Sequence, residues 1–89
     1  MNRIALDDGS WFDLDAAVKL GSNKRPNDFR FQNLYRSRAG SYILADITYW
    51  AKEKNSYSRV SLEVAAGCLI AWCCKLPHEL EEAAACKEV

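Results

Sequence analysis

The strongest constraint on the fold comes from two consecutive runs of aromatic and β-branched residues in the middle of the chain. Residues 33–38 and 42–50 have the composition of β-strands, and the Ala-Gly-Ser segment at 39–41 has the composition of a turn. Two strands joined by so short a connection form an antiparallel hairpin. Residues 57–60 read as a third antiparallel strand after a polar connection, so the middle of the chain predicts a sheet.

The register of this hairpin follows from the cost of burying charge. A loop of about three residues pairs Arg38 with Tyr42 and Arg36 with Leu44. It places both arginines on the outer face of the sheet and Tyr35 with the core side chains. A two-residue loop would turn both arginines toward the apolar face, and a buried unpaired charge is costly. We therefore prefer the longer loop.

A short helix is expected before the hairpin. Asp13 or Asp15 can accept hydrogen bonds from the free amides of a helix start, which predicts a helix over residues 14–20. Gly21 then suits the position that ends a helix. Residues 11–12, Trp-Phe, read as a short strand just before it.

Two more helices are expected after the sheet. Ser61 is a good N-cap for a helix over residues 62–74, which is apolar nearly all round and should be buried on more than one side. Pro77 suits the first turn of a last helix that runs from His78 to about Lys87. The predicted fold is α+β, with a three- to four-stranded antiparallel β-sheet surrounded by about three short α-helices.

Length and charge narrow the class of protein. The 89 residues suffice for a single domain, residues 1–89. Lys and Arg number 12 and Asp and Glu number 12, which disfavours both a strongly basic nucleic-acid protein and a strongly acidic mimic as descriptions of the whole chain. No apolar run approaches the roughly 20 residues of a membrane span, and residues 1–6 lack signal-peptide features. We expect a cytoplasmic monomer without a membrane partner, although an apolar side left over on the 62–74 helix would equally suit a dimer.

The four cysteines, Cys68, Cys73, Cys74 and Cys86, are expected to be free thiols. In a reducing cytosol such residues pack as small hydrophobic side chains. A zinc site of Cys74, His78 and Cys86 is the alternative, but the chain has no C-x-x-C pair and Pro77 interrupts the helical spacing of the first two. We expect no metal and no cofactor.

Catalytic motifs are lacking as well. The sequence contains no H-E-x-x-H, no G-x-S-x-G and no phosphate-binding Walker loop. Helix capping accounts for the pair Asp13 and Asp15 better than acid–base chemistry does. We expect a protein that is not an enzyme and has no catalytic residues.

The neutral total charge conceals a pattern along the chain. Residues 1–18 carry one base and four acids, residues 19–59 carry nine bases and three acids, and residues 60–89 carry two bases and five acids. The acids of the two ends could form one acidic face that imitates DNA phosphates and occupies the DNA groove of another protein. This candidate partner-binding face consists of Asp7, Asp8, Asp13, Asp15, Glu79, Glu81 and Glu82.

The basic middle of the chain supports a second candidate. Arginines and aromatic rings on one side of a hairpin can hold phosphate and stack bases. The alternative nucleic-acid face consists of Arg36, Arg38, Tyr42 and Trp50, with Lys24, Arg25 and Arg30 upstream. Each face could equally be an ordinary solvated surface, in which carboxylates cap helices and long side chains cover a thin sheet.

Several segments resemble those of a group of small bacterial and phage-borne proteins built from a short helix, a β-hairpin and a closing helical pair. The segments are W-F-D-L-D at 11–15, L-Y-R-S-R-A-G-S-Y-I-L at 34–44, Y-S-R-V-S-L-E-V-A at 57–65 and P-H-E-L at 77–80. The chain departs from that group in its cysteine-rich segment at 69–74. As a whole it is similar to a phage-encoded anti-CRISPR protein that acts on a type I system.

This resemblance implies a protein–protein inhibitor. Such a protein binds a subunit of the Cascade complex in the bacterial cytoplasm, with the large subunit that reads the protospacer-adjacent motif (PAM) as the expected partner, and blocks recognition of target DNA. It would not contact nucleic acid directly, and its acidic face would serve as a DNA mimic. The alternatives are a small nucleic-acid-binding domain that uses the basic aromatic face and an accessory interaction module with no inhibitory role.

Overall fold

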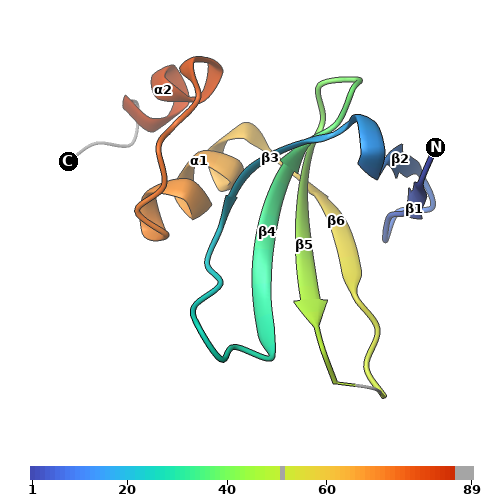
Figure 1. Cartoon of the computed structure of the whole chain (residues 1–89). Coiled ribbons are helices and arrows are strands. Elements are labelled where there is room, and N and C mark those ends of the chain that lie inside the picture. Colours follow the sequence, from blue (N-terminus) through green and yellow to red (C-terminus); the bar gives the residue numbers. More distant parts are fainter. Residues whose placement is uncertain (51, 86–89) are drawn as a thin grey trace.

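The fold is α+β, with two antiparallel sheets and two helices (Figure 1). It is described from a computed structural model, for residues 1–50 and 52–85. The elements follow in the order β1 (Arg3–Ala5), β2 (Trp11–Asp13), a 3-10 turn (Leu14–Ala16), β3 (Val18–Ser22), β4 (Arg30–Arg36), β5 (Tyr42–Thr48), β6 (Ser56–Val60), α1 (Leu62–Ala71) and α2 (His78–Ala85). Within these residues, no helix has the length and apolarity to cross a membrane.

The larger sheet is a meander in which β3, β4, β5 and β6 lie in chain order. The predicted central hairpin is confirmed, but its register is not: Arg36, rather than Arg38, pairs with Tyr42. The connecting loop therefore spans residues 37–41, and Gly40 enters the left-handed region there with φ of 90°. Because the shift is an even number of residues, each side chain keeps the face that alternation assigned to it.

The helix expected over residues 14–20 is wrong. Asp13 does cap a helical turn, accepting a hydrogen bond from the Asp15 backbone N–H at 3.1 Å, but the turn is a single 3-10 turn and the chain then extends into β3. β3 pairs antiparallel with β4, which would otherwise present an unpaired edge. Pairing with a neighbour distant in sequence thus overrides the local helical preference.

Gly21 has a packing role in place of the predicted helix-ending role. It lies in β3, directly beneath α1. A Cβ atom at this position would approach Leu69 Cδ2 to 2.6 Å and the Cys74 sulfur to 3.0 Å. The residue is a glycine because the helix and the edge strand meet too closely for any side chain.

α1 and α2 cover one face of the sheet, near the end where β4 and β5 connect (Figure 1). Ser61 caps α1 as predicted, by accepting a hydrogen bond from the Val64 backbone N–H. The buried side chains of this layer are Leu34, Tyr42, Ala65, Ala66, Leu69 and Leu80. Leu80, Ala83 and Ala84 pack inward from α2, as its pattern predicts, while Cys86 lies outside the described residues.

α1 is shorter and more exposed than predicted. It ends at Ala71, and Cys73 follows with a positive φ of 58°. Leu62, Val64 and Ile70 are 45%, 47% and 53% exposed, so the helix is buried on one side only. The apolar composition could not show this, because the sheet offers the helix a single face to pack against.

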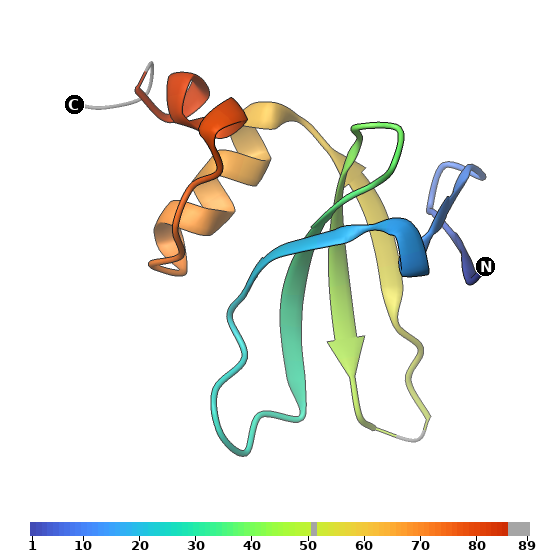
Figure 2. The ribbon, with the colours of Figure 1, turned by 45° about the horizontal axis from the view of Figure 1, so that its top comes forward.

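The N-terminal hairpin, β1–β2, covers the opposite face of the sheet (Figure 2). Leu6 and Phe12 pack against Ile43, and Phe12 lies within 6.2 Å of Tyr35 and 5.9 Å of Tyr57 between ring centres. The Asp7 backbone N–H also donates to the Tyr57 carbonyl. At one end, the sheet therefore lies between the helices and the hairpin. The helices cover the face that carries Arg36 and Tyr42, which was predicted to be the outer face.

Candidate nucleic-acid interface

The basic face predicted from the sequence is not assembled. Arg36 is bonded to Glu79 of α2, and Tyr42 is only 8% exposed. Arg38 lies in the β4–β5 loop, whereas Trp50 follows the far end of β5. Burial, together with the nearby Glu79 charge, raises the pKa of Tyr42. The two helices thus occupy the surface on which a nucleic acid would have to lie.

The predicted acidic face is divided into two groups. The first group surrounds β1–β2 and the 3-10 turn and consists of Asp7, Asp8, Asp13 and Asp15. The second lies on α2 and consists of Glu79, Glu81 and Glu82. The hairpin and α2 pack against opposite faces of the sheet (Figure 2), so one continuous acidic surface is not formed.

Two of the hairpin carboxylates have structural partners. Asp8 accepts hydrogen bonds from the hydroxyl and backbone N–H of Ser10 and lies 3.5 Å from Arg59, and these contacts hold its pKa below the ordinary value. Asp13 accepts from the Asn2 backbone N–H at 3.0 Å, which lowers its pKa likewise. Turn formation and capping account for both residues. Asp7 and Asp15 are exposed, and Asp15 Oδ2 lies 3.7 Å from the N-terminal ammonium.

The carboxylates of α2 are also engaged. Glu79 pairs with Arg36, and Glu81 Oε2 lies 3.6 Å from His78 Nδ1. The Arg36–Glu79 pair joins one residue from each predicted face. These two faces are therefore in contact with each other and do not form separate surfaces.

The opposite end of the sheet brings together a different set of side chains. In a meander, the β3–β4 and β5–β6 connections lie at the same end of the sheet. In this protein that end is remote from both helices and from the N-terminal hairpin (Figure 1). We call residues 23–30 and 49–55 the basic aromatic end; Ala51 within it is not described. Its five bases are Lys24, Arg25, Arg30, Lys52 and Lys54, against the two acids Asp28 and Glu53.

Two large aromatic side chains stack at this end in contact with solvent. Phe29 and Trp50 are 58% and 56% exposed, and their ring centres are 5.3 Å apart. The Tyr49 backbone N–H donates to the Phe29 carbonyl, which continues the β4–β5 pairing beyond the strands, and the Trp50 N–H donates to Thr48 Oγ1. The backbone at the base of the pair is therefore fixed.

A second aromatic contact lies beside the first. Lys24 Nζ is 5.2 Å from the ring centre of Phe31 and 5.3 Å from that of Tyr49. The two rings meet edge to face at 5.5 Å. This arrangement keeps a lysine charge against the faces of two aromatic rings at the same end of the sheet.

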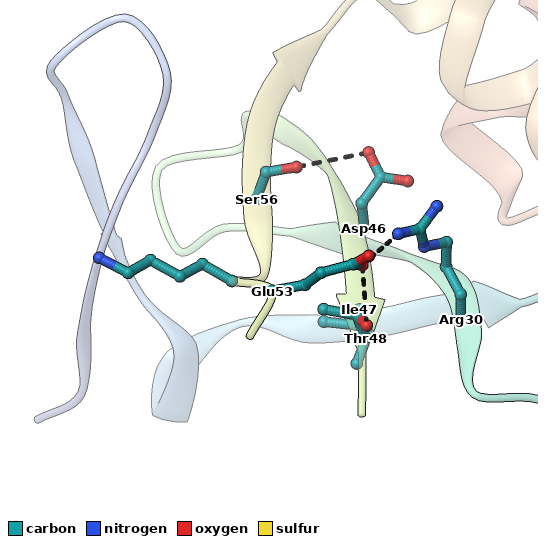
Figure 3. Close-up of a pocket in the computed structure, with 7 residues that line it drawn as sticks. Arg30, Asp46, Ile47, Thr48, Glu53 and Ser56 are labelled. Carbon is teal, nitrogen blue, oxygen red and sulfur yellow. Dashed lines mark hydrogen bonds and ion pairs between the residues drawn. The ribbon is translucent and has the colours of Figure 1, made fainter. Parts of the chain in front are cut away.

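A polar hollow of about 370 Å³ opens on the sheet between these loops (Figure 3). Arg30 is bonded to Glu53, and this contact lowers the pKa of the Glu53 carboxyl. Asp46 accepts a hydrogen bond from Gln32 Nε2 at 2.9 Å and from Ser56 Oγ at 3.4 Å. The hollow lies on the face that carries α1, on the part of it that the helix does not cover.

The sequence identified part of this end and missed the rest. The predicted nucleic-acid face includes four residues of this end, Trp50, Lys24, Arg25 and Arg30. It does not include Phe29, Tyr49, Lys52 and Lys54. The available signal was topological: the loops before and after a predicted hairpin lie together at the end opposite its turn. Comparison with protein-family models, with curated proteins and with solved structures finds no match to this chain.

In the described residues the cysteines are free thiols as predicted, but Cys73 is exposed and does not pack as a buried hydrophobic side chain. Cys68, Cys73 and Cys74 are free thiols. Burial raises the pKa of Cys68, as expected for a thiol that packs as a hydrophobic side chain. The alternative zinc site includes Cys86, which lies outside the described residues.

Proposed function

We propose that this protein binds single-stranded nucleic acid at its basic aromatic end. The observation that carries the proposal is the stacked pair Phe29 and Trp50. Both rings are more than half exposed, and five lysine and arginine residues lie at the same end of the sheet. Base–aromatic stacking contributes about 1–3 kcal/mol per base, and lysine and arginine side chains bind the adjoining phosphates. The site replaces the predicted face of Arg36, Arg38 and Tyr42 and retains its Trp50.

The geometry favours unpaired bases over a duplex. Bases within a duplex already stack on one another, and their faces are not available to a protein ring. A pair of rings at a loop end offers a platform only to a base that has left such a stack. Neutral overall charge is compatible with this function, because five of the twelve Lys and Arg residues but only two of the twelve Asp and Glu residues lie at the basic aromatic end.

Fluorescence anisotropy with a labelled oligo(dT) at low salt tests the proposal. The double variant Phe29→Ala with Trp50→Ala should lose about fivefold to 150-fold in affinity, since one stacked base contributes about 1–3 kcal/mol. Trp11→Ala is the matched control, because Trp11 is 53% exposed and lies 4.5 Å from Arg3 but belongs to the N-terminal hairpin. Absence of binding by the wild type, or an equal loss in the control, would contradict the proposal.

We propose as a second candidate the anti-CRISPR function that the resemblance implies. The observation that favours it is that four acids, Asp7, Asp8, Asp13 and Asp15, belong to the hairpin and the 3-10 turn that follows it, on one side of the sheet. This surface would bind the DNA-reading surface of a type I Cascade subunit, in particular the large PAM-reading one, in the cytoplasm of a bacterial host. The α2 carboxylates would not take part, because they lie on the other side of the sheet.

Charge reversal tests this second candidate. Asp7→Lys with Asp15→Lys reverses two exposed charges and leaves the turn held by Asp8 and the cap held by Asp13 intact, although it removes the contact between Asp15 and the N-terminal ammonium. Capture of purified type I Cascade should fall with this double variant. It should stay unchanged with Glu81→Lys and Glu82→Lys, the matched double on α2. Equal capture by all three proteins, or no capture by the wild type, would contradict the candidate.

A further inference from the structure

We infer that the polar hollow beside the Phe29–Trp50 pair recognises a guanine base of the bound single strand. This inference rests on the proposed nucleic-acid function and adds a base preference to it. The groups concerned are Asp46, which would read the Watson–Crick edge of the base, and Arg30 in the same hollow (Figure 3). Lys54 also lines the hollow.

The hollow and the aromatic pair share backbone. Arg30 directly follows Phe29 in the chain. Thr48 Oγ1 accepts a hydrogen bond from the Trp50 N–H at 3.1 Å, and the Glu53 N–H donates to the Trp50 carbonyl at 3.1 Å. These shared segments favour a path in which a strand with one base stacked on the pair places a neighbouring base at the hollow.

Asp46 is placed as a hydrogen-bond acceptor for a ligand. It is exposed on β5, and one neutral donor holds each of its oxygens, Gln32 Nε2 on Oδ1 and Ser56 Oγ on Oδ2. Within residues 1–50 and 52–85, no cation forms an ion pair with it, since Arg30 is bonded to Glu53. Each carboxylate oxygen has a second lone pair, so both oxygens can accept a further hydrogen bond.

Guanine is the base that matches two adjacent acceptors. Its Watson–Crick edge carries two neighbouring donors, N1–H and the N2 amino group, and a carboxylate accepts both in a charge-assisted bidentate contact. Its O6 and N7 atoms are acceptors that suit arginine or lysine. Lys54 and Arg30 line the same hollow as Asp46, and Arg30 keeps N–H donors that its bond to Glu53 does not use, so both kinds of partner are present.

The other bases match less well. Adenine and cytosine place a ring acceptor next to their single amino group, and that acceptor would face a carboxylate oxygen across the contact. Thymine and uracil have one N–H between two carbonyl oxygens, which would repel the carboxylate on either side. The carboxylate therefore selects guanine by attraction and rejects the other three by repulsion.

An inosine substitution tests the inference without depending on the folding of a variant. Three oligonucleotides are compared by anisotropy: oligo(dT), the same strand with one central guanine, and the same strand with hypoxanthine in place of guanine. Hypoxanthine lacks only the N2 amino group. The wild type should bind the guanine strand about tenfold more tightly than the other two, the discrimination expected of a bidentate contact.

The variant Asp46→Asn should bind all three strands with equal affinity, because an asparagine offers one acceptor and one donor. Asp28→Asn is the matched control, since it removes one negative charge from the same end and can still accept the Arg25 N–H that Asp28 Oδ2 accepts at 2.8 Å. It should retain the guanine preference. Binding of oligo(dT) with no guanine preference would overturn this inference and leave the proposed function standing. Failure to bind any strand would overturn both.

Discussion

The N-terminal hairpin and the basic aromatic end each carry an exposed tryptophan, but they are built differently. In the hairpin, alternation along β2 turns Trp11 outward and Phe12 inward, and the strand is anchored by Phe12, which is 4% exposed. At the basic aromatic end the strands have finished, and Phe29 and Trp50 stack mainly on each other. Trp11 is exposed because its neighbour Phe12 packs into the core. Packing does not explain why Phe29 and Trp50 are exposed.

Some charged residues of the two regions also differ in whether they have a structural partner. Asp8 and Asp13 of the hairpin satisfy a turn and a cap, and both contacts keep the carboxylates ionised. Among the described residues, Lys52 and Lys54 of the basic aromatic end form no ion pair. An exposed side chain with a structural role is weak support for binding, and one without such a role is stronger support.

Removing an aromatic ring from each region should give the largest difference between the regions, measured as the loss in free energy of unfolding. Phe12→Ala should lower the free energy of unfolding by about 3–5 kcal/mol, because the ring is buried between the hairpin and the sheet. Phe29→Ala should lower it by less than about 1 kcal/mol, because that ring is mostly exposed. Urea unfolding followed by circular dichroism measures both values. Similar losses in the two variants would show that Phe29 is part of the core and would break the comparison.

Removing lysines should change the salt dependence of binding. Lys52→Gln with Lys54→Gln should weaken oligo(dT) binding and make the slope of log affinity against log salt shallower by about 1.4, at about 0.7 per lost phosphate contact with a single strand. The matched double, Lys19→Gln with Lys75→Gln, removes the same charge near α2 and should leave the slope unchanged. Anisotropy titrations at several salt concentrations measure the slopes. Equal slopes for both doubles would mean that net charge, and not the basic aromatic end, determines binding.

The pH dependence of stability should show the smallest effect. Asp8 and Asp13 have pKa values held below the ordinary value of 3.8, so below about pH 5 the unfolded chain binds more protons than the folded one. The stability they contribute is present above pH 3.8 and is lost as the pH falls through their lower folded values. Replacing both by Asn should make the fall in urea midpoint between pH 5 and pH 3 less steep.

The basic aromatic end offers a counterpart to this measurement. Arg30 holds the pKa of Glu53 below its ordinary value of 4.5. Glu53→Gln should therefore also make the fall in urea midpoint between pH 5 and pH 3 less steep, but by less, because it removes one carboxylate and not two. A larger effect from Glu53→Gln than from the two Asn replacements together would indicate that the basic aromatic end is held more strongly by ionic contacts than the hairpin is.

Local patterns predicted much of the fold and only part of the site. Alternation and turn composition identified the central hairpin, and capping residues located the starts of α1 and of the turn after Asp13. Local pattern failed at residues 14–20, where pairing with β4 decided the structure, and at Gly21, where contact with Leu69 did. It also failed for Tyr42, whose alternation was correct but whose face is covered by helices from a later part of the chain.

The sequence by itself determined the α+β class, the central hairpin, the inward stripe of α2 and the concentration of bases in the middle of the chain. These depend on periodicity, caps and turn residues, which act over a few neighbouring positions. Only the tertiary structure decided which face the helices cover, that the predicted acidic face divides into two, and that Phe29 meets Trp50. Those outcomes depend on which elements pack against one another across the sheet, and contacts between residues far apart in sequence leave no local pattern.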